Sequence, residues 1–359
     1  MRKICGWFVL ILLVAAGSSV RSQVDTNETI RINTSLINIP VIVSDRDNRY
    51  VPGLTKSNFR VFQDGVEQSV EIFNNDSAPM NVILALDTSR STAGVLGKIK
   101  KAARKFIKDL GPEDRCMIVT FDNDIEILSG LTSNKKDLES AIKNATIGAQ
   151  FGTVLRDAVY DAVQRQLRGE KGRKALILLT DGADFGSNVS RSQLFDLLTE
   201  SDTVVYPIFY ESAMRVRDSF PRRFPDQVGM GRIGRRGGIG GRQRRFPSDN
   251  YPGRNPNRQN RRNLPGGGVN RPNSEIQQQL SIAFLEELSE KTGGRFFREQ
   301  KADLGDAFQQ IVDEMKRQYV LGFYPLSDSP AGTEHKIKVQ VDRPGIVVRA
   351  KSRYRTQAQ

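Results

Sequence analysis

Four short runs of apolar residues, separated by stretches with helical spacing, constrain the fold of this chain more than any other feature. The runs occupy residues 82–86, 116–121, 175–179 and 204–209. Because they are apolar throughout, they are typical of strands buried on both faces of a parallel sheet. Helical spacing covers residues 94–110, 135–144, 153–167, 192–200, 275–291 and 304–317, with a further strand predicted at 293–297. Strands that alternate with helices predict an α/β fold with a doubly wound, mostly parallel sheet.

Both ends of the chain show the apolar–polar alternation of antiparallel strands. An N-terminal β segment is predicted at residues 29–78 and a C-terminal β segment at residues 319–359. Neither segment has enough core positions to fold alone, because small all-β pieces are rarely stable by themselves. We therefore expect the two segments to pair into one β-sandwich-like unit that flanks the α/β domain. The sole histidine, His335, is expected on the solvent side of its strand.

An Arg-rich segment at residues 211–274 interrupts the α/β pattern. It contains 15 Arg, no Lys and four acidic residues, and so supplies +11 of the net charge of +13 of this 359-residue chain. It also contains 11 Gly and seven Pro. Because so little aliphatic content cannot offset the entropy of ordering a chain, we predict a disordered insertion. The α/β domain is accordingly predicted at residues 80–210 and 275–318.

The first 22 residues have the order of a secretory signal peptide. Arg2 and Lys3 precede an apolar run at residues 6–16, which is followed by a small, polar stretch ending at Ser22. The run is well short of the roughly 20 residues that a membrane-spanning helix needs. A cleaved signal peptide at residues 1–22 is therefore expected, with a retained anchor as the alternative. The mature chain is expected to be exported (periplasmic, cell-surface or secreted) and to lack a transmembrane segment.

The composition excludes several kinds of chemistry. One His and two Cys leave no material for a His-based acid/base relay, a Cys/His zinc cluster or an internal disulfide. Cys116 lies within an apolar run and is expected to be a buried core residue. No phosphate-binding loop or dinucleotide fingerprint is present. These observations favour a protein that is not an enzyme.

Oxygen-bearing side chains follow two of the apolar runs. Asp87, Ser89 and Ser91 come directly after the first run, and Asp181 follows the third. Ligands of open parallel sheets bind at the carboxyl ends of the strands, where we expect these side chains to emerge at the surface. Carboxylates and hydroxyls are hard donors that suit Mg²⁺, Mn²⁺ or Ca²⁺. Taken alone, Asp and Ser at these positions are equally typical of helix caps.

The wider motif gives the pattern more meaning. The order Asp-x-Ser-x-Ser, then Gly-Thr at Thr153, then Leu-Leu-Thr-Asp-Gly resembles the von Willebrand factor A domain, a Rossmann-like fold. In that family the motif is the metal-ion-dependent adhesion site. The resemblance implies that Ser89 and Ser91 bind a divalent cation directly and that Thr153 does so when a ligand is engaged. It further implies that Asp87 and Asp181 bind directly or through water.

The flanking segments also resemble a known family. Their motifs are similar to those around the A domain of exported bacterial proteins called VWFA-related. These motifs occupy residues 41–45, 51–54, 58–59, 63–65, 72–73, 319–324 and 349–354. The resemblance spans nearly all of the chain after the signal segment, except the Arg-rich segment.

The leading functional hypothesis is a non-enzymatic, cation-dependent protein-binding module of the adhesion type. It would bind Mg²⁺, with Mn²⁺ or Ca²⁺ as alternatives, and the cation would attract an Asp or Glu of a partner protein. The alternative is a binder of anionic polymers or surfaces through the Arg-rich segment. Nucleic acid is disfavoured as its ligand because the segment has few aromatic residues and the chain is expected to be exported. A hydrolase using the cation is a third, weaker hypothesis, because no candidate base adjoins the site beyond its own ligands.

Overall fold

The computed structural model describes residues 36–47, 49–75, 78–211, 274–299, 304–325, 330 and 332–356. All of them belong to one unit, Thr34–Gln359. The predicted signal peptide at residues 1–22 and residues 212–273 of the predicted Arg-rich insertion lie outside the described residues. Within the described part, no helix combines the length and the apolar character required to cross a membrane.

A six-stranded sheet forms the centre of the α/β domain. Its spatial order is β10 (Phe297–Glu299), β9 (Val204–Tyr210), β8 (Arg173–Thr180), β5 (Met80–Asp87), β6 (Arg115–Phe121) and β7 (Ile125–Thr132). All neighbouring pairs are parallel except β6 and β7. Every residue of β5 and β9 is buried, which agrees with their largely apolar sequences. The predicted doubly wound, mostly parallel α/β sheet is therefore confirmed.

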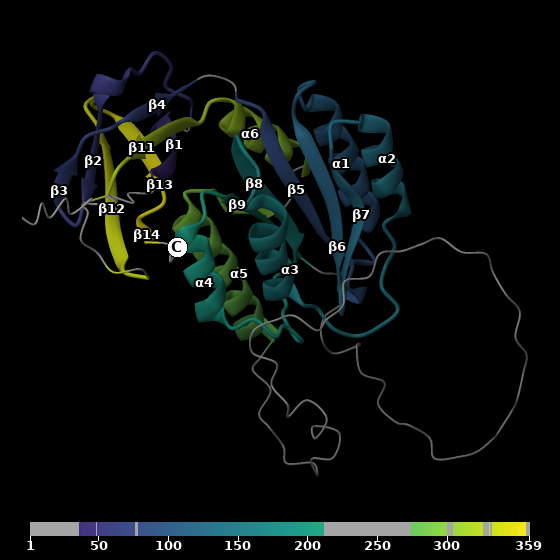
Figure 1. The fold of residues 1–359 in the computed structure, drawn as a ribbon. Coiled ribbons are helices and arrows are strands. Elements are labelled where there is room, and N and C mark those ends of the chain that lie inside the picture. The colour runs from purple at the N-terminus through teal and green to yellow at the C-terminus, as the bar shows by residue number, and fades with distance from the viewer. Residues whose placement is uncertain are drawn as a thin grey trace, which may run out of the picture. The chain divides into compact units, whose positions relative to one another are not determined.

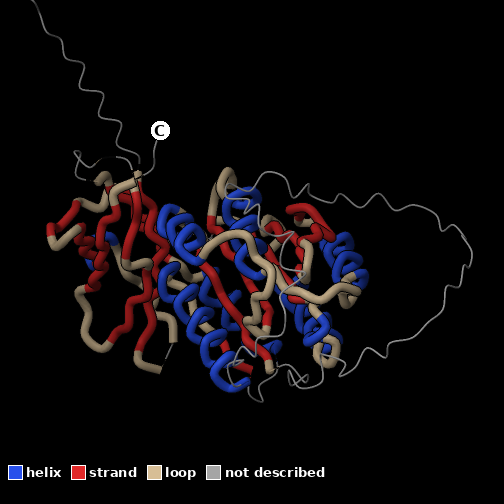
Figure 2. The backbone as a smooth tube through the Cα atoms, turned by 90° about the horizontal axis from the view of Figure 1, so that it is seen from below, coloured by secondary structure: helices blue, strands red, loops and turns tan. Residues whose placement is uncertain are grey.

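Helices cover both faces of this sheet (Figure 2). One face packs against α1 (Leu96–Asp109), α2 (Lys135–Asn144) and α6 (Leu304–Lys316). The other packs against α3 (Leu155–Asp161), its π-helical continuation Ala162–Leu167, α4 (Arg191–Glu200) and α5 (Ser274–Thr292). Because α5, β10 and α6 follow residue 273, elements from both sides of the Arg-rich segment build the same layers.

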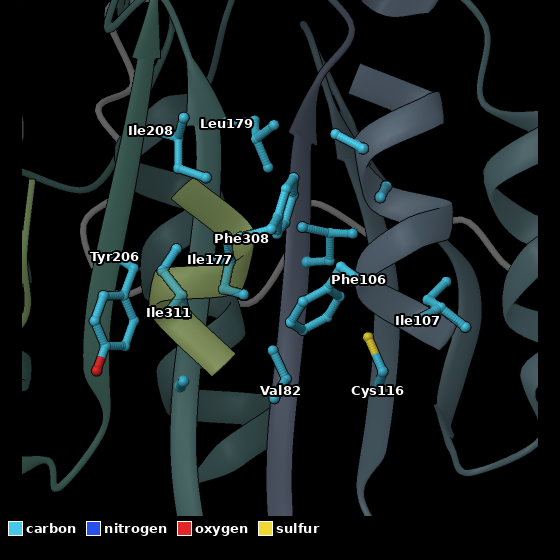
Figure 3. Close-up of a cluster of buried hydrophobic side chains, with 14 of the residues drawn as sticks. Val82, Phe106, Ile107, Cys116, Ile177, Leu179, Tyr206, Ile208, Phe308 and Ile311 are labelled. Atoms are coloured by element: carbon cyan, nitrogen blue, oxygen red, sulfur yellow. The ribbon is translucent and has the colours of Figure 1, made fainter. Parts of the chain in front are cut away.

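Alternate residues of the central strands supply the two cores. Val82 of β5 faces α1 and α6, whereas Ile83 faces the opposite layer. Figure 3 shows the first core, in which the rings of Phe106 and Phe308 lie 5.2 Å apart. Cys116 is fully buried here, and burial raises the pKa of its thiol to about 12. The expectation of a core cysteine is therefore confirmed.

The terminal segments form two four-stranded antiparallel sheets, and each sheet contains strands from both ends of the chain. The first has the order β13 (Ile346–Ala350), β1 (Ile37–Asp45), β11 (Tyr319–Phe323) and β4 (Ile72–Asn74). The second has the order β14 (Arg353–Arg355), β12 (Glu334–Val341), β2 (Phe59–Gln63) and β3 (Val66–Gln68). Figure 1 shows the purple N-terminal strands beside the yellow C-terminal strands. The predicted flanking β-sandwich built from both ends is thus confirmed.

The sandwich has its own hydrophobic core, separate from the cores of the α/β domain. Leu321 of β11 lies opposite Ile39 of β1 and opposite Phe73 of β4. Tyr319 sits among aromatic rings, and its hydroxyl bonds to the Tyr50 hydroxyl at 2.8 Å. The core is therefore made by residues from both ends of the chain, which explains why neither end is sufficient alone.

The structure differs from the sequence predictions in three local details. The edge strand β7 was not predicted, because its mixed sequence lacks the apolar run of its neighbours. The strand expected at 293–297 begins only at Phe297, since Gly293 has a φ of +76° and the backbone at Gly294 packs tightly against the Val205 carbonyl. The helix expected from residue 153 begins at Leu155 and becomes π-helical at residue 162.

His335 is buried, contrary to the expectation that it faces solvent. Its ring stacks on Tyr354, and its Nδ1 lies 2.7 Å from an oxygen of Asp64. This hydrogen bond lowers the pKa of Asp64. His335 is buried because it lies opposite Tyr354 on the neighbouring strand β14 and stacks on its ring. Alternation within one strand does not indicate this contact between strands.

Polar side chains connect the sandwich to the α/β domain. Arg349 of β13 forms an ion pair with Glu314 of α6 at 2.7 Å. Lys351 donates to the backbone carbonyl of Ser201 at 3.2 Å. Because Lys351 is buried, its pKa is lowered from 10.5 to about 8. The contact surface thus contains an ammonium group that is stabilised only weakly by its surroundings.

Leu321→Ala should lower the free energy of unfolding by about 2–5 kcal/mol, because it removes a fully buried side chain from the sandwich core. Hydrogen exchange should accelerate in β1 as well as in β11, although the two strands come from opposite ends of the chain. Val347→Ala in β13 is the control, since this side chain is 42% exposed and should change stability by less than about 0.5 kcal/mol. Unchanged exchange in β1 after Leu321→Ala would contradict the shared core.

Lys351→Met should flatten the pH dependence of stability. Between about pH 8 and pH 10.5 the unfolded chain retains a proton that folded Lys351 has released, so the free energy of unfolding of the wild type rises with pH there. Denaturant titrations across this interval should show a wild-type slope up to about 1.4 kcal/mol per pH unit steeper than that of the variant. Exposed Lys338→Met serves as the control and should leave the slope unchanged. If the free energy of unfolding of Lys351→Met and of the wild type changed with pH to the same extent, the lowered pKa of Lys351 would be refuted.

Candidate metal centre

The predicted site residues emerge from three loops at the carboxyl edge of the sheet. Asp87 ends β5, and Ser89 and Ser91 lie in the turn that follows it. Asp181 comes directly after β8, and Thr153 precedes α3. Because β5 and β8 are neighbouring parallel strands, their final residues meet at the same edge.

The Asp-Ser turn gathers its own oxygen atoms. The backbone N–H of Ser89 donates to Oδ1 of Asp87 at 2.9 Å. The Oγ atoms of Ser89 and Ser91 lie 2.9 Å apart. This local geometry brings a carboxylate and two hydroxyls together, as the motif spacing predicted. The backbone turn, and not a helix cap, accounts for the arrangement, since the Ser89 side chain makes no cap hydrogen bond to the short helix Arg90–Thr92.

Asp87 is fully buried, whereas we expected it at the surface end of its strand. The hydroxyl of Thr180 donates to its Oδ2 at 2.7 Å, and that of Thr92 donates to its Oδ1 at 3.4 Å. Burial, together with the negative charge of Asp181, raises the pKa of Asp87 to about 7. The carboxylate is enclosed by the groups that bond to it, namely Ser89 and Thr92 after β5 and Thr180 at the end of β8. A cation at this point would favour the ionised form.

Backbone contacts hold the loop of Thr153 in place. Gly148 donates to the carbonyl of Thr88 at 2.9 Å, and Val154 donates to the carbonyl of Asp122 at 2.8 Å. Gly152 has a φ of +145°, and a Cβ there would lie only 2.8 Å from Oδ1 of Asn123. The glycine before Thr153 therefore has a steric reason: with a side chain at this position the loop could not approach Asn123, in the turn between β6 and β7, so closely.

The loops of Thr153 and Asp181 are tied to each other. The N–H of Phe185 donates to the carbonyl of Thr153 at 3.0 Å. In α3, the carboxylate of Asp157 accepts hydrogen bonds from the backbone N–H groups of Asn188 and Val189, in the same loop as Phe185, at 2.8–3.0 Å. Asp157 is 3% exposed, so these bonds are shielded from water. The contacts that bring Thr153 to the site run through its backbone, whereas Ser89 and Ser91 meet through their side chains.

This donor set suits a hard divalent cation. It consists of two carboxylates and three hydroxyls, without a sulfur or imidazole ligand, which matches the preference of Mg²⁺, Mn²⁺ and Ca²⁺. Among the described residues, no group of three or more His, Cys, Asp and Glu side chains is placed to hold a metal. A cation at the carboxyl edge therefore depends on hydroxyl ligands. The like charges of Asp87 and Asp181 also fit this assignment, because a cation between them would offset their repulsion.

Comparison with protein families identifies the segment that carries these residues. Residues 82–183 match the von Willebrand factor type A domain, and this range contains all five predicted site residues. The chain contains a von Willebrand factor type A domain. The predicted resemblance of this segment to the A domain is thus confirmed. No match was found among curated proteins.

Several solved structures are similar to this chain. An aerotolerance-related membrane protein from Bacteroides fragilis is 18% identical, with 66% of this chain and 98% of that chain covered and a TM-score of 0.41. Proximal thread matrix protein 1 from the mussel byssus, in a form with a zinc-occupied MIDAS motif, is 24% identical; the match covers 39% of this chain and 38% of that one, with a TM-score of 0.35. The vWF domain of the pili tip protein Mfa5 from Porphyromonas gingivalis is 21% identical over 32% and 43% of the two chains, with a TM-score of 0.28.

Sequence reasoning missed the residues that support the A-domain site. Thr92 and Thr180 bond to Asp87, and the hydroxyl of Tyr210 lies 2.9 Å from that of Thr92. Each threonine adjoins a motif residue, which was the available signal. Tyr210 and Asp157 gave no such signal, because their roles depend on loops that are distant in sequence.

Asp157→Ala should destabilise the A domain by about 1–3 kcal/mol, because it leaves buried N–H groups of residues 188 and 189 without their acceptor. Thermal unfolding measures the loss, and hydrogen exchange should become faster at these two amides first. The exposed Glu113→Ala is a matched loss of an acidic side chain and should leave both readouts unchanged. If Asp157→Ala kept slow exchange at residues 188 and 189, the proposed tie between the loops would be wrong.

Proposed function

We propose that this protein is an exported, non-enzymatic binding module whose A domain captures a partner protein through a divalent cation. Ser89 and Ser91 bind the cation through their hydroxyls, and Thr153 joins them when the partner is engaged. Asp87 and Asp181 bind directly or through water. An Asp or Glu of the partner completes the coordination. The A-domain match supports this proposal, since domains of this type mediate protein–protein interactions.

The burial of Asp87 beside Asp181 is the observation that carries the proposal. The hydrogen bonds to Asp87 come from Ser89, Thr92 and Thr180, all of them neutral donors. Burying a carboxylate next to a like charge is costly unless a cation compensates it. The arrangement is therefore explained most simply as one half of a metal centre.

The charge of the ligands explains why a partner carboxylate would bind. Three of the five protein ligands are neutral hydroxyls, and at most two are negative. A cation so held remains electrophilic at its open position, and an incoming carboxylate gains a favourable ionic bond. Mg²⁺ is the first choice on the basis of the all-oxygen donor set, with Mn²⁺ and Ca²⁺ as alternatives.

The chemistry of the site supports binding in preference to catalysis. Tyr210 is the titratable group that the hydrogen bonds connect to Asp87, through Thr92. Burial and the two nearby carboxylates raise the pKa of Tyr210 well above 10. Tyr210 therefore keeps its proton at neutral pH and does not serve as a general base.

Calorimetric titration with Mg²⁺ tests the proposal. Wild-type protein should bind the cation, and Ser91→Ala should weaken binding about ten-fold or more because a direct ligand is lost. Asp87→Asn should also lose affinity, while circular dichroism shows a retained fold, since Asn has nearly the same shape. Ser133→Ala, an exposed serine outside the site, is the matched control and should bind like wild type.

Equal Mg²⁺ affinity for wild type, Ser91→Ala and Asp87→Asn would overturn the assigned ligands. No binding of Mg²⁺, Mn²⁺ or Ca²⁺ by the wild type would overturn the cation-dependent function itself. In that case the Arg-rich segment, with 15 Arg in residues 211–274, would become the leading site for anionic polymers or surfaces. Such binding should weaken steeply with added salt and be indifferent to chelator.

A further inference from the structure

Exposed apolar side chains gather around the candidate metal centre. Of the eight large hydrophobic side chains that are exposed in the described part of the chain, four lie at the carboxyl edge of the A domain. Phe151 is 60% exposed and Phe185 is 68% exposed. Such side chains contribute little to the core, and exposed apolar groups that cluster beside polar ones mark interaction surfaces.

The ring of Phe151 is held by the metal motif itself. The guanidinium carbon of Arg90 lies 4.0 Å from the ring centroid, within the range of a cation–π contact. The same guanidinium donates to the carbonyl of Ala149 at 2.7 Å. Arg90 stands between the proposed ligands Ser89 and Ser91. The turn that would bind the cation therefore also positions an aromatic ring and a positive charge beside it.

Phe185 is held by a backbone contact to Thr153. Its backbone N–H donates to the carbonyl of Thr153, while its side chain projects into solvent. Phe151 lies two positions before Thr153 in the sequence. Phe151 therefore belongs to the loop of Thr153, and Phe185 belongs to the Asp181 loop, which is hydrogen-bonded to Thr153.

Helix α5 extends the apolar surface at the same edge. Ile276 is 50% exposed and Leu280 is 57% exposed, and the two lie one turn apart at the start of the helix. The next residue, Ser281, packs against Gly182 of the Asp181 loop: a Cβ added at Gly182 would lie 2.8 Å from that of Ser281. The apolar side chains thus belong to elements that contact the metal motif.

We propose that the A domain selects a partner segment in which an Asp or Glu is flanked by large apolar side chains, with Phe151 and Phe185 as specificity-determining residues. This inference rests on the proposed function, because it places the acidic residue on the cation. The positive charge of Arg90 and of the cation complements the carboxylate, and the two exposed rings provide apolar area on the loops that carry the proposed ligands. Aromatic side chains beside a buried polar contact are typical of the residues that dominate binding energy at interfaces.

Short synthetic peptides provide the probes. The first has the sequence Ac-Gly-Leu-Phe-Glu-Phe-Leu-Gly-amide, the second has Gly and Ser in place of the apolar residues, and the third has Gln in place of Glu. Fluorescence polarisation with Mg²⁺ should show the first binding about ten-fold tighter than the second, because its apolar side chains become buried. The third should bind at least ten-fold more weakly than the first, and chelator should reduce the first to the level of the third.

The double variant Phe151→Ala/Phe185→Ala should remove the preference for the first peptide over the second while leaving Mg²⁺ affinity unchanged. The control is Val66→Ala/Val347→Ala, which truncates two exposed apolar side chains of the sandwich and should keep the preference. Cation-dependent binding with equal affinity for the first two peptides would overturn this inference and leave the proposed function intact. Equal binding of the Glu and Gln peptides, or binding indifferent to chelator, would overturn the proposed function.

Discussion

Burial of the parallel sheet on both faces is the constraint on which the rest of the A domain depends. Strands β5 and β9 have no solvent-facing side, so helices must cover each face of the sheet. The connections between strands and helices therefore begin and end at the ends of the strands. Polar side chains consequently have room only at the strand ends. The carboxyl edge therefore collects Asp87, Asp181 and the Thr153 loop, although these positions are far apart in the sequence.

At these strand ends the negative charges of Asp87 and Asp181 repel each other, and among the described residues no positively charged side chain bonds to Asp87. Asp87 is buried next to Asp181, and its hydrogen bonds within the described part of the chain come from neutral donors only, among them the hydroxyl of Thr180. In this arrangement a bound cation would act on stability as well as on recognition, because any ligand that binds only the folded state shifts the folding equilibrium toward it. Folding and ligand capture would then be linked through one group of oxygen atoms.

The sequence was sufficient to predict the layers and the sandwich, because each leaves a periodic pattern, whereas the metal ligands that the motif spacing indicates stay a prediction. Apolar runs predicted β5, β6, β8 and β9, and alternation predicted β1, β2, β4, β11, β12 and β13, but not the three-residue strands β3 and β14. What was missed depends on tertiary contacts. The mixed sequence of β7 becomes a strand only because β6 offers it an edge, and His335 becomes buried only when it stacks on Tyr354. Asp87 was expected at the surface because it ends a strand. Its burial depends on contacts with residues distant in sequence, such as Thr180, which the local sequence does not indicate.

The sandwich also has a consequence for the order of events when the chain is made. Strand β1 pairs on one side with β11 and on the other with β13, and Tyr50 contacts Tyr319 across 269 positions. During synthesis β1 therefore has neither of its partner strands, β11 and β13, until most of the chain has been made. Contacts of such long sequence separation slow folding, and an unpaired strand is open to wrong pairing in the meantime. The residues in between, however, can already form most of the A domain, which would give the late C-terminal strands a surface on which to close the sandwich.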